Sequence, residues 1–293
     1  MTTKTIQSGT VSDAYLAILA DRGIDYLFAN AGTDFAPIIE AYAKAQALGT
    51  KVPQPVTVPH ENVAINMAQG YYVRTGRPQA VMVHVNVGTA NAMCGLINGW
   101  RGNIPVFFTS GRTPYSEEGG LSGQRSIDIH WPQEMRDQRA MTREFMKWDY
   151  ELPNAQVLES SLDRALNIAM TEPRGPVYMT LPREVLAAPI ENFHYASPSR
   201  HATPSNPYPD TNAIEKAADL LAAAENPLII TNSAGREESD VGKLEAFAER
   251  FAIPVIQRKH RYMCLSHNHP MNLGYDLNDY FDNADVIVVL ESD

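Results

Sequence analysis

Three short segments of the chain place polar side chains and glycine directly after apolar runs that have the pattern of β-strands. They are Asn30–Ala31–Gly32–Thr33, His60–Glu61, and the run HVNVGTAN from His84 to Asn91. Open α/β sheets bind their ligands where the strands end, and carboxylate and imidazole groups carry protons in enzymes. The three segments therefore suit a ligand site with acid–base chemistry, although glycines at such places also serve plain strand-to-helix turns.

Glu61 is the acidic residue of these three segments and lies in the first turn of a predicted helix. The residues that follow it, NVAINMAQGYYV, are mostly apolar and small. A carboxylate in a first turn is commonly stabilised by the helix dipole and then has no further role. From periodicity alone, that interpretation is favoured over a catalytic one.

His84 is the second candidate for chemistry. It lies in the apolar run QAVMVHV, which predicts a strand over residues 79–85. A histidine within an apolar strand is more often a structural residue than a catalyst, so its position alone does not assign it a role in a reaction.

Alternating strand and helix patterns must position these residues. Short apolar runs predict strands over residues 26–30, 54–59, 79–85, 104–109 and 176–181. Helical periodicity predicts helices over residues 11–21, 35–47, 61–74, 88–100 and 160–171. Strands and helices that alternate at this spacing form a parallel sheet with helices on both faces, so we predict an α/β fold. The segment 111–139 is glycine-rich and irregular, which is typical of functional or mobile loops.

A stretch rich in proline and serine, ASPSRHATPSNPYP at 196–209, divides the chain into two parts. We predict a first domain over residues 1–190, a linker over 191–209 and a second α/β unit over 210–293. The second unit has predicted helices at 211–224 and 241–251 and predicted strands at 227–231, 253–257 and 285–290. A doubly wound domain rarely finishes on a strand without a covering helix, so we expect this unit to be a partial domain.

Composition excludes several classes of protein. Acidic side chains outnumber basic ones, 34 to 24, and the formal net charge is −10. Nucleic acids and anionic membranes attract clustered Lys and Arg, so neither is expected as a partner. Cys94 and Cys264 are the two cysteines and lie far apart, which disfavours a disulfide framework or a cysteine metal site. We read no secretory signal and no apolar run long enough to span a bilayer, and we expect a cytoplasmic protein.

A series of motifs in fixed order resembles the pyrimidine-binding domain of thiamine-diphosphate-dependent enzymes. The motifs are Glu61 at the start of its helix, GYYVRTG at 70–76, GTAN at 88–91, IPV at 104–106 and GPVYMTLP at 175–182. Their order and spacing over residues 10–190 are far more specific than a single glycine pattern. Within the family, HVNVGTANAMCGLINGW and KWDYE are similar to benzoylformate decarboxylase, and His60–Glu61 is also similar to the acetolactate synthase branch.

The resemblance implies roles for individual residues. Glu61 would bind N1′ of the cofactor's aminopyrimidine and so promote deprotonation of C2, while the cofactor supplies the electron sink. His84 would act in acid–base catalysis or position the substrate, and Gln133 would reach the substrate. The implied cofactor-binding residues are Asn30, Gly32, Thr33, Glu61, Gly88 and Asn91.

The implied activity is that of a 2-oxo acid decarboxylase, or of a carboligase or lyase acting on a carbon–carbon bond next to a carbonyl. The substrate would be a 2-oxo acid or an acyloin. The family holds Mg²⁺ and the diphosphate through a G-D-G run, which this chain lacks. We therefore expect no metal ligand here, a diphosphate-binding domain on another segment or partner chain, and a homo- or hetero-oligomer with residues 74–100 in the interface.

Two alternatives stay open. One is an acetolactate-synthase-like carboligase with FAD or an adenosine nucleotide on the second unit, for which a yellow preparation would be the sign. The other is a regulatory or structural subunit that keeps the fold without catalysis, in which Glu61 would contact no pyrimidine.

Overall fold

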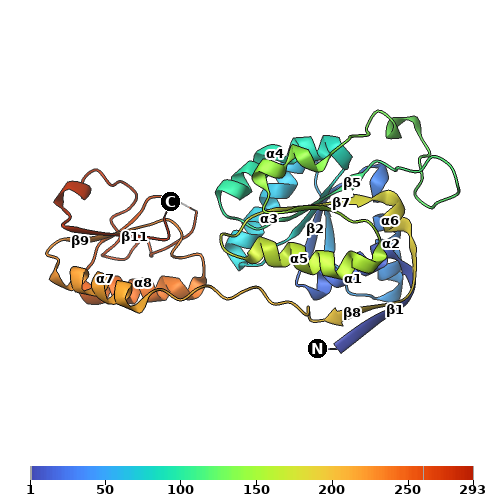
Figure 1. Ribbon diagram of the computed structural model, residues 1–293. Helices are drawn as coiled ribbons and strands as arrows, with labels where there is room; N and C mark the ends of the chain where they lie inside the picture. Colours follow the sequence, from blue (N-terminus) through green and yellow to red (C-terminus); the bar gives the residue numbers. More distant parts are fainter. Residues whose placement is uncertain (1, 260, 293) are drawn as a thin grey trace. The chain divides into compact units, whose positions relative to one another are not determined.

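The protein is described by a computed structural model that covers residues 2–259 and 261–292. These residues fold into two compact units, which divide between Ser205 and Asn206. The division falls within residues 191–209, where a linker is predicted. Figure 1 shows that each unit contains a sheet with helices packed against it.

The first unit is built around a six-stranded sheet in the order β3-β2-β4-β5-β7-β6. Its strands are β2 (Tyr26–Asn30), β3 (Gln54–Thr57), β4 (Ala80–Val83), β5 (Phe107–Arg112), β6 (Asp149–Glu151) and β7 (Val177–Pro182). Every neighbouring pair in the sheet is parallel. All strands therefore end at one common edge, and the predicted α/β class with a parallel sheet is confirmed.

Helices cover both faces of this sheet (Figure 1). One layer contains α1 (Val11–Asp21), α2 (Ala36–Leu48), α5 (Leu158–Met170) and α6 (Arg183–Ala187), and the other contains α3 (Glu61–Thr75) and α4 (Val85–Arg101). Strand β4 shows how the core divides: Ala80 and Met82 pack in the cluster of the first layer, and Val81 and Val83 pack in the cluster of α3 and α4. Both faces are apolar because successive side chains of a strand point to opposite sides.

Helices α3 and α4 lie in close contact because α4 carries glycine where they meet. A Cβ atom at Gly95 would fall 2.7 Å from Asn62 Oδ1 and 2.8 Å from Ile65 Cγ2. Gln69, buried on α3, donates a hydrogen bond of 2.6 Å to the Gly95 carbonyl oxygen. Since each helix follows a parallel strand, this contact brings the N-terminal ends of α3 and α4 together at the carboxyl edge of the sheet.

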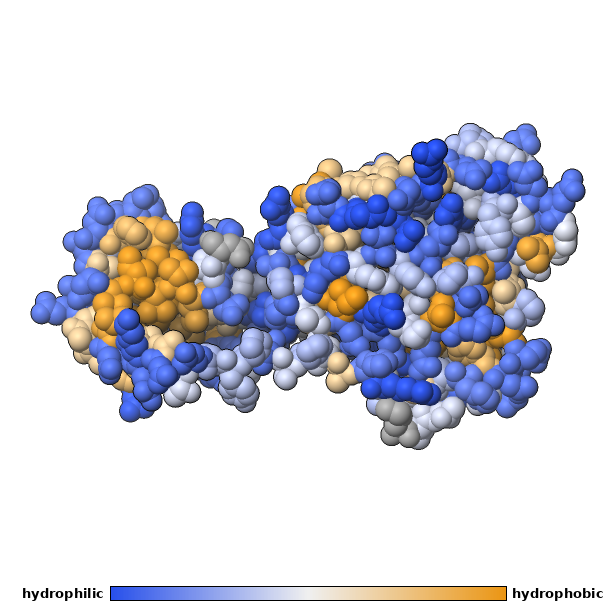
Figure 2. Space-filling view, viewed as in Figure 1, coloured by the Kyte–Doolittle hydropathy of each residue, from blue (hydrophilic) through white to orange (hydrophobic). Residues whose placement is uncertain are grey.

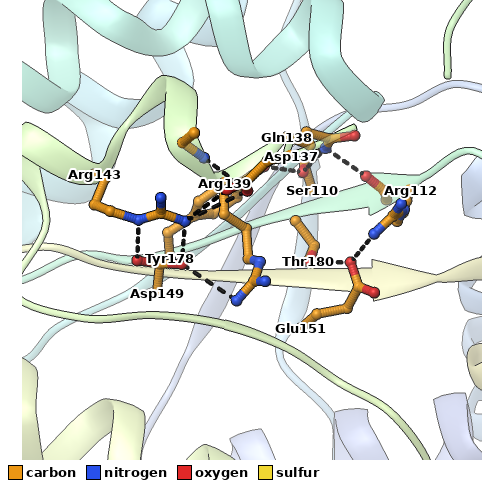
Figure 3. A network of polar contacts seen from close by, with 12 residues as sticks. Ser110, Arg112, Asp137, Gln138, Arg139, Arg143, Asp149, Glu151, Tyr178 and Thr180 are labelled. Atoms are coloured by element: carbon orange, nitrogen blue, oxygen red, sulfur yellow. Dashed lines mark hydrogen bonds and ion pairs between the residues drawn. The ribbon is translucent and has the colours of Figure 1, made fainter. Parts of the chain in front are cut away.

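The irregular segment after β5 is fixed to the sheet at its far end (Figure 3). Gln138 Nε2 donates to Ser110 Oγ at 2.8 Å and lies 3.2 Å from the Tyr178 hydroxyl oxygen. Arg143 donates to Asp149 at the start of β6. The segment contains three 3₁₀ turns, η2 (Asp128–His130), η3 (Arg139–Met141) and η4 (Arg143–Phe145), and others in the chain are η1 (Thr33–Phe35), η5 (Ala155–Val157) and η6 (Phe281–Asn283).

The sequence did not predict a two-stranded antiparallel ribbon formed by β1 (Thr2–Thr10) and β8 (Pro189–Ser197). Most side chains of β1 are exposed, and the strand reads TTKTIQSGT. A polar strand that buries little has no alternating apolar pattern, and its existence depends on a partner that lies far away in the sequence.

The second unit has a three-stranded parallel sheet in the order β10-β9-β11. Its elements are α7 (Thr211–Ala223), β9 (Pro227–Thr231), α8 (Glu238–Phe251), β10 (Val255–Gln257) and β11 (Val286–Leu290). Large hydrophobic side chains are exposed on it, among them Ile214, Phe251 and Val289, and Figure 2 shows apolar surface on this unit. Within the described part of the chain, no helix has the length and apolar character needed to cross a membrane.

Candidate active site

The three segments singled out in the sequence meet at the carboxyl edge of the six-stranded sheet. Glu61 contacts Asn91 from the next helix, and Gly32 lies against the ring of His84. Gln133 reaches the same ring from the irregular segment. The structure thus brings together residues separated by up to about a hundred positions. Their polar side chains form two clusters, one around Glu61 and one around His84.

The hydrogen bond that holds the Glu61 carboxylate comes from α4, and His60 Nδ1 lies 4.0 Å from the same oxygen. Asn91 Nδ2 donates to Glu61 Oε2 at 3.1 Å. The cap of α3 is His60, whose Nδ1 accepts a hydrogen bond of 3.1 Å from the Asn62 backbone N–H. Among the residues that the structure describes, Glu61 Oε1 has no hydrogen-bond partner. One carboxylate oxygen is therefore anchored and the other is available to a ligand.

Gly88 makes room for this carboxylate. A Cβ atom at Gly88 would lie 2.9 Å from Val83 Cβ and 3.3 Å from Glu61 Oε1. The glycine is buried, and it lets the first turn of α4 pass close to the end of β4 and to Glu61. A side chain here would push against the oxygen that faces the site.

His84 does not lie in a strand, which corrects the prediction of a strand over residues 79–85. β4 stops at Val83, His84 is the N-cap residue of α4, and α4 begins at Val85. Consequently Gly88 and Asn91 belong to the first two turns of the helix and not to a turn that precedes it. The early start is possible because Val85 adopts φ 32°, a left-handed conformation that is costly for a β-branched residue.

Asp34 holds both the histidine ring and this strained backbone. Its Oδ1 lies 2.6 Å from His84 Nδ1, and its Oδ2 accepts a hydrogen bond of 3.2 Å from the Val85 backbone N–H. Asp34 is 1% exposed, in the 3₁₀ turn that follows β2. Asp34 was not predicted as a site residue, although it is acidic and directly follows the polar segment Asn30–Thr33 at the end of a predicted strand.

Two histidines near this edge have pKa values displaced in opposite directions. The hydrogen bond to Asp34 raises the pKa of His84 above its ordinary value; the charges of Asp34 and Glu61 act in the same direction and partial burial opposes them. Burial lowers the pKa of His130, and the neighbouring charges of Arg183 and Arg125 add to that effect. Of these two histidines, His84 is therefore the one whose surroundings favour the protonated form.

The remaining predicted residues lie at the same edge with different contacts. Gln133 Nε2 lies 3.1 Å from His84 Nε2. Thr33 is exposed, its Oγ1 is 3.3 Å from His130 Nε2, and its carbonyl oxygen accepts from Arg183. Asn30 donates a hydrogen bond of 2.9 Å to the carbonyl oxygen of Val58, so its amide nitrogen connects β2 to the residue after β3.

No group of three or more His, Cys, Asp or Glu side chains within residues 2–259 and 261–292 is arranged to bind a metal ion. The site can instead exchange protons. It combines a carboxylate with a free oxygen, a histidine held by a second carboxylate, and two helix N-termini whose dipoles favour negative charge.

An open parallel sheet with polar side chains gathered at its carboxyl edge is typical of the class of α/β proteins that bind ligands where the strands end. Family comparison is more specific. Residues 9–141 match the model of the thiamine pyrophosphate enzyme N-terminal TPP binding domain, and residues 214–292 match that of the thiamine pyrophosphate enzyme central domain. The chain belongs to the family of thiamine pyrophosphate enzymes, as the resemblance predicts. Thiamine pyrophosphate is the same molecule as thiamine diphosphate.

Individual relatives include decarboxylases and synthases. Benzoylformate decarboxylase of Pseudomonas aeruginosa is 25% identical over 252 residues, which are 84% of this chain and 43% of that protein. The acetolactate synthase large subunit of Haemophilus influenzae is 26% identical over 242 residues, 81% of this chain and 39% of that protein. The chain thus spans less than half the length of these two relatives.

Solved structures share the fold. A thiamine diphosphate-dependent 4-hydroxybenzoylformate decarboxylase from Rhodococcus jostii has a TM-score of 0.76 at 23% identity, covering 96% of this chain and 52% of that one. Benzoylformate decarboxylase from Polynucleobacter necessarius has a TM-score of 0.78 at 21% identity, covering 96% of this chain and 51% of that one.

Proposed function

We propose that this chain carries the cofactor-activating part of a thiamine-diphosphate-dependent 2-oxo acid decarboxylase or carboligase, with Glu61 as the activating carboxylate. The observation that supports this most is the state of the Glu61 side chain. Its Oε2 is held by Asn91 while its Oε1 is available at the carboxyl edge, with the Gly88 backbone leaving space beside it. This arrangement fits a heteroaromatic nitrogen that shares a proton with Oε1.

Thiamine diphosphate, when bound, supplies a nucleophilic C2 carbanion, and its thiazolium ring accepts the electrons of the bond that breaks. Glu61 would hold a proton between its Oε1 and N1′ of the aminopyrimidine, which favours the imino form needed to deprotonate C2. Asn91 keeps the carboxylate in this orientation through Oε2. Gly88, Asn30, Gly32 and Thr33 would shape the surface against the cofactor.

His84 and Gln133 would act on the substrate. The Gln133 amide contacts His84 at Nε2, the ring nitrogen that does not face Asp34. A protonated His84 would bind the carboxylate or carbonyl oxygen of a 2-oxo acid, and a neutral one would accept a proton. An acyloin offers a carbonyl oxygen and a neighbouring hydroxyl group, so the same arrangement would suit bond breaking as well as bond making.

The Mg²⁺ and the diphosphate would be held outside this chain's residues, because the family's G-D-G run does not occur in the sequence. A diphosphate-binding domain on a further segment or a partner subunit would complete the site. Exposed apolar side chains of α3 and α4 agree with such a partner, since Val63 and Met67 are 47% and 40% exposed and Val87 is 49% exposed. Sedimentation of the active enzyme tests this, and an active monomer that contains no further domain would contradict it.

Turnover of 2-oxo acids tests the proposed function. In the active enzyme, Glu61→Gln should lower kcat for decarboxylation by about 10²–10⁴-fold, which is the usual contribution of a group that transfers a proton. Glu159→Gln is the matched control, because it makes the same chemical change at a carboxylate that pairs with Arg22 and not with the residues around Glu61. Equal effects of the two variants on kcat would contradict the proposal.

A further inference from the structure

We infer that Asp34 is a positioning residue that keeps the proton of neutral His84 on Nδ1 and directs Nε2 toward the substrate. The orientation toward substrate rests on the proposed function. The choice of ring nitrogen rests on geometry within this chain alone.

The first step is the contact between the two side chains. Asp34 Oδ1 is 2.6 Å from His84 Nδ1, and Asp34 is buried with only 1% of its surface exposed. A carboxylate only accepts hydrogen bonds, so Nδ1 must carry the proton in this contact. Nε2 of the neutral ring is then an acceptor.

The second step is that Asp34 cannot easily turn away. Its Oδ2 already accepts from the backbone N–H of Val85, whose φ of 32° would be difficult to keep without such a contact. A Cβ atom at Gly111 would lie 1.8 Å from Oδ2, so the glycine of β5 provides the space that the carboxylate fills. Both oxygens of Asp34 are therefore committed.

The third step concerns the ring. A Cβ atom at Gly32 would fall 2.2 Å from His84 Cγ and Nδ1, so the ring lies flat against the Gly32 backbone. Neither Gly32 nor Asp34 contacts Nε2, the other nitrogen of the ring, and 17% of the His84 side chain is exposed. The Gln133 amide group at 3.1 Å covers Nε2. A substrate oxygen would take the place of this amide.

Other charged groups near the ring do not explain the tautomer. The charge of Glu61 on α3 raises the pKa of His84 through space, and the charge of His84 in turn lowers the pKa of His130 in η2. Neither forms a hydrogen bond with the ring. Asp34 at Nδ1 and the Gln133 amide at Nε2 are the groups that bond to the ring, and the carboxylate fixes the proton because it can only accept, whereas an amide can donate or accept.

Asp34→Asn replaces one carboxylate oxygen by an amide nitrogen, and the Val85 backbone N–H decides which side of the new side chain faces it, because this N–H needs an oxygen acceptor. The Asn oxygen should stay with that N–H, which leaves the amide NH₂ facing His84 Nδ1. A donor at that position would move the proton of the neutral ring to Nε2, and the loss of the negative charge would lower the pKa of His84.

The experiment is a ¹H–¹⁵N correlation of the histidine rings in the full chain, followed across pH. His84, one of 8 histidines, is assigned by its missing signals in His84→Gln. We expect Nδ1–H in the wild type, and Nε2–H with a lower pKa in Asp34→Asn. The active Asp34→Asn enzyme should lose kcat by up to about 10²–10⁴-fold, with little change in the KM for thiamine diphosphate.

Asp163→Asn is the matched control, since Asp163 is buried and paired with Arg22 far from this edge. It should lower the melting temperature without changing the His84 signals. A neutral wild-type ring protonated on Nε2, or an Asp34→Asn ring with unchanged tautomer and pKa, would overturn the inference. The wild-type spectrum decides even if Asp34→Asn does not fold. These readouts need no cofactor, so they stay informative if the proposed function is wrong.

Discussion

Asn91 Nδ2 lies 3.1 Å from Glu61 Oε2 and connects the second turn of α4 to the first residue of α3. The two helices meet through the small residues of α4, so their positively polarised ends share one edge of the sheet. The hydrogen bond selects which carboxylate oxygen is held and which is free.

Gly88→Ala should destabilise the protein. Its methyl group would lie 2.9 Å from Val83 Cβ and 3.3 Å from Glu61 Oε1, and overpacking of this kind costs about 1–3 kcal/mol. Gly70→Ala is the control, because nothing lies within 4 Å of a Cβ at that position in α3. It should stabilise by roughly 0.5–1 kcal/mol through helix propensity. Urea unfolding measures both, and a stabilising Gly88→Ala would contradict the packing.

Stability should depend on pH with opposite signs at two histidines. A raised folded-state pKa gives His84 a contribution that is complete below the unfolded-state value of about 6.5 and lost as pH rises through the folded value. The lowered pKa of His130 gives the reverse: stability present above about 6.5 and lost as pH falls through the folded value. Unfolding free energies of His84→Gln and His130→Gln, each subtracted from wild type across pH, should slope in opposite directions. If the two difference curves slope in the same direction, the surroundings of one of the two histidines are not those described here.

Gln138→Leu should release the irregular segment that leads from β5 to β6. The side chain is buried and its Nε2 donates to Ser110 Oγ and to the Gly111 carbonyl oxygen (Figure 3). Its loss removes two buried hydrogen bonds, each worth about 0.5–1.5 kcal/mol, although Ser110 Oγ keeps the Tyr178 hydroxyl as a partner. Hydrogen exchange of residues 113–137 should become faster. Gln54→Leu, at an exposed position of β3, should leave that exchange unchanged.

The sequence predicted the elements whose burial is periodic. The helix at 11–21 and the strands at 26–30 and 227–231 have the predicted bounds, because each buries an apolar face and has a clear stop. The β1–β8 ribbon was missed, since exposed polar strands have no such pattern.

The candidate site was predicted only in part, for a related reason. Glu61, Gly88 and Asn91 belong to motifs that are local in sequence. Asp34 acts on His84, which is 50 residues further along the chain. A contact of that kind depends on how two strand ends meet, which local periodicity does not encode.

The most direct test of Glu61 as the activating carboxylate is the exchange of the C2 proton of bound thiamine diphosphate into D₂O, followed by NMR after acid quenching. Glu61→Gln in the active enzyme keeps the shape and can still bond to Asn91, but its amide cannot share a proton with N1′. We predict that exchange slows by about 10²–10⁴-fold while folding changes little. If Glu61 only stabilises its helix through the helix dipole, the variant should lose about 0.3–1 kcal/mol of unfolding free energy. The C2 proton of the bound cofactor should then exchange at the wild-type rate. Wild-type exchange in Glu61→Gln would contradict the proposed role of this residue.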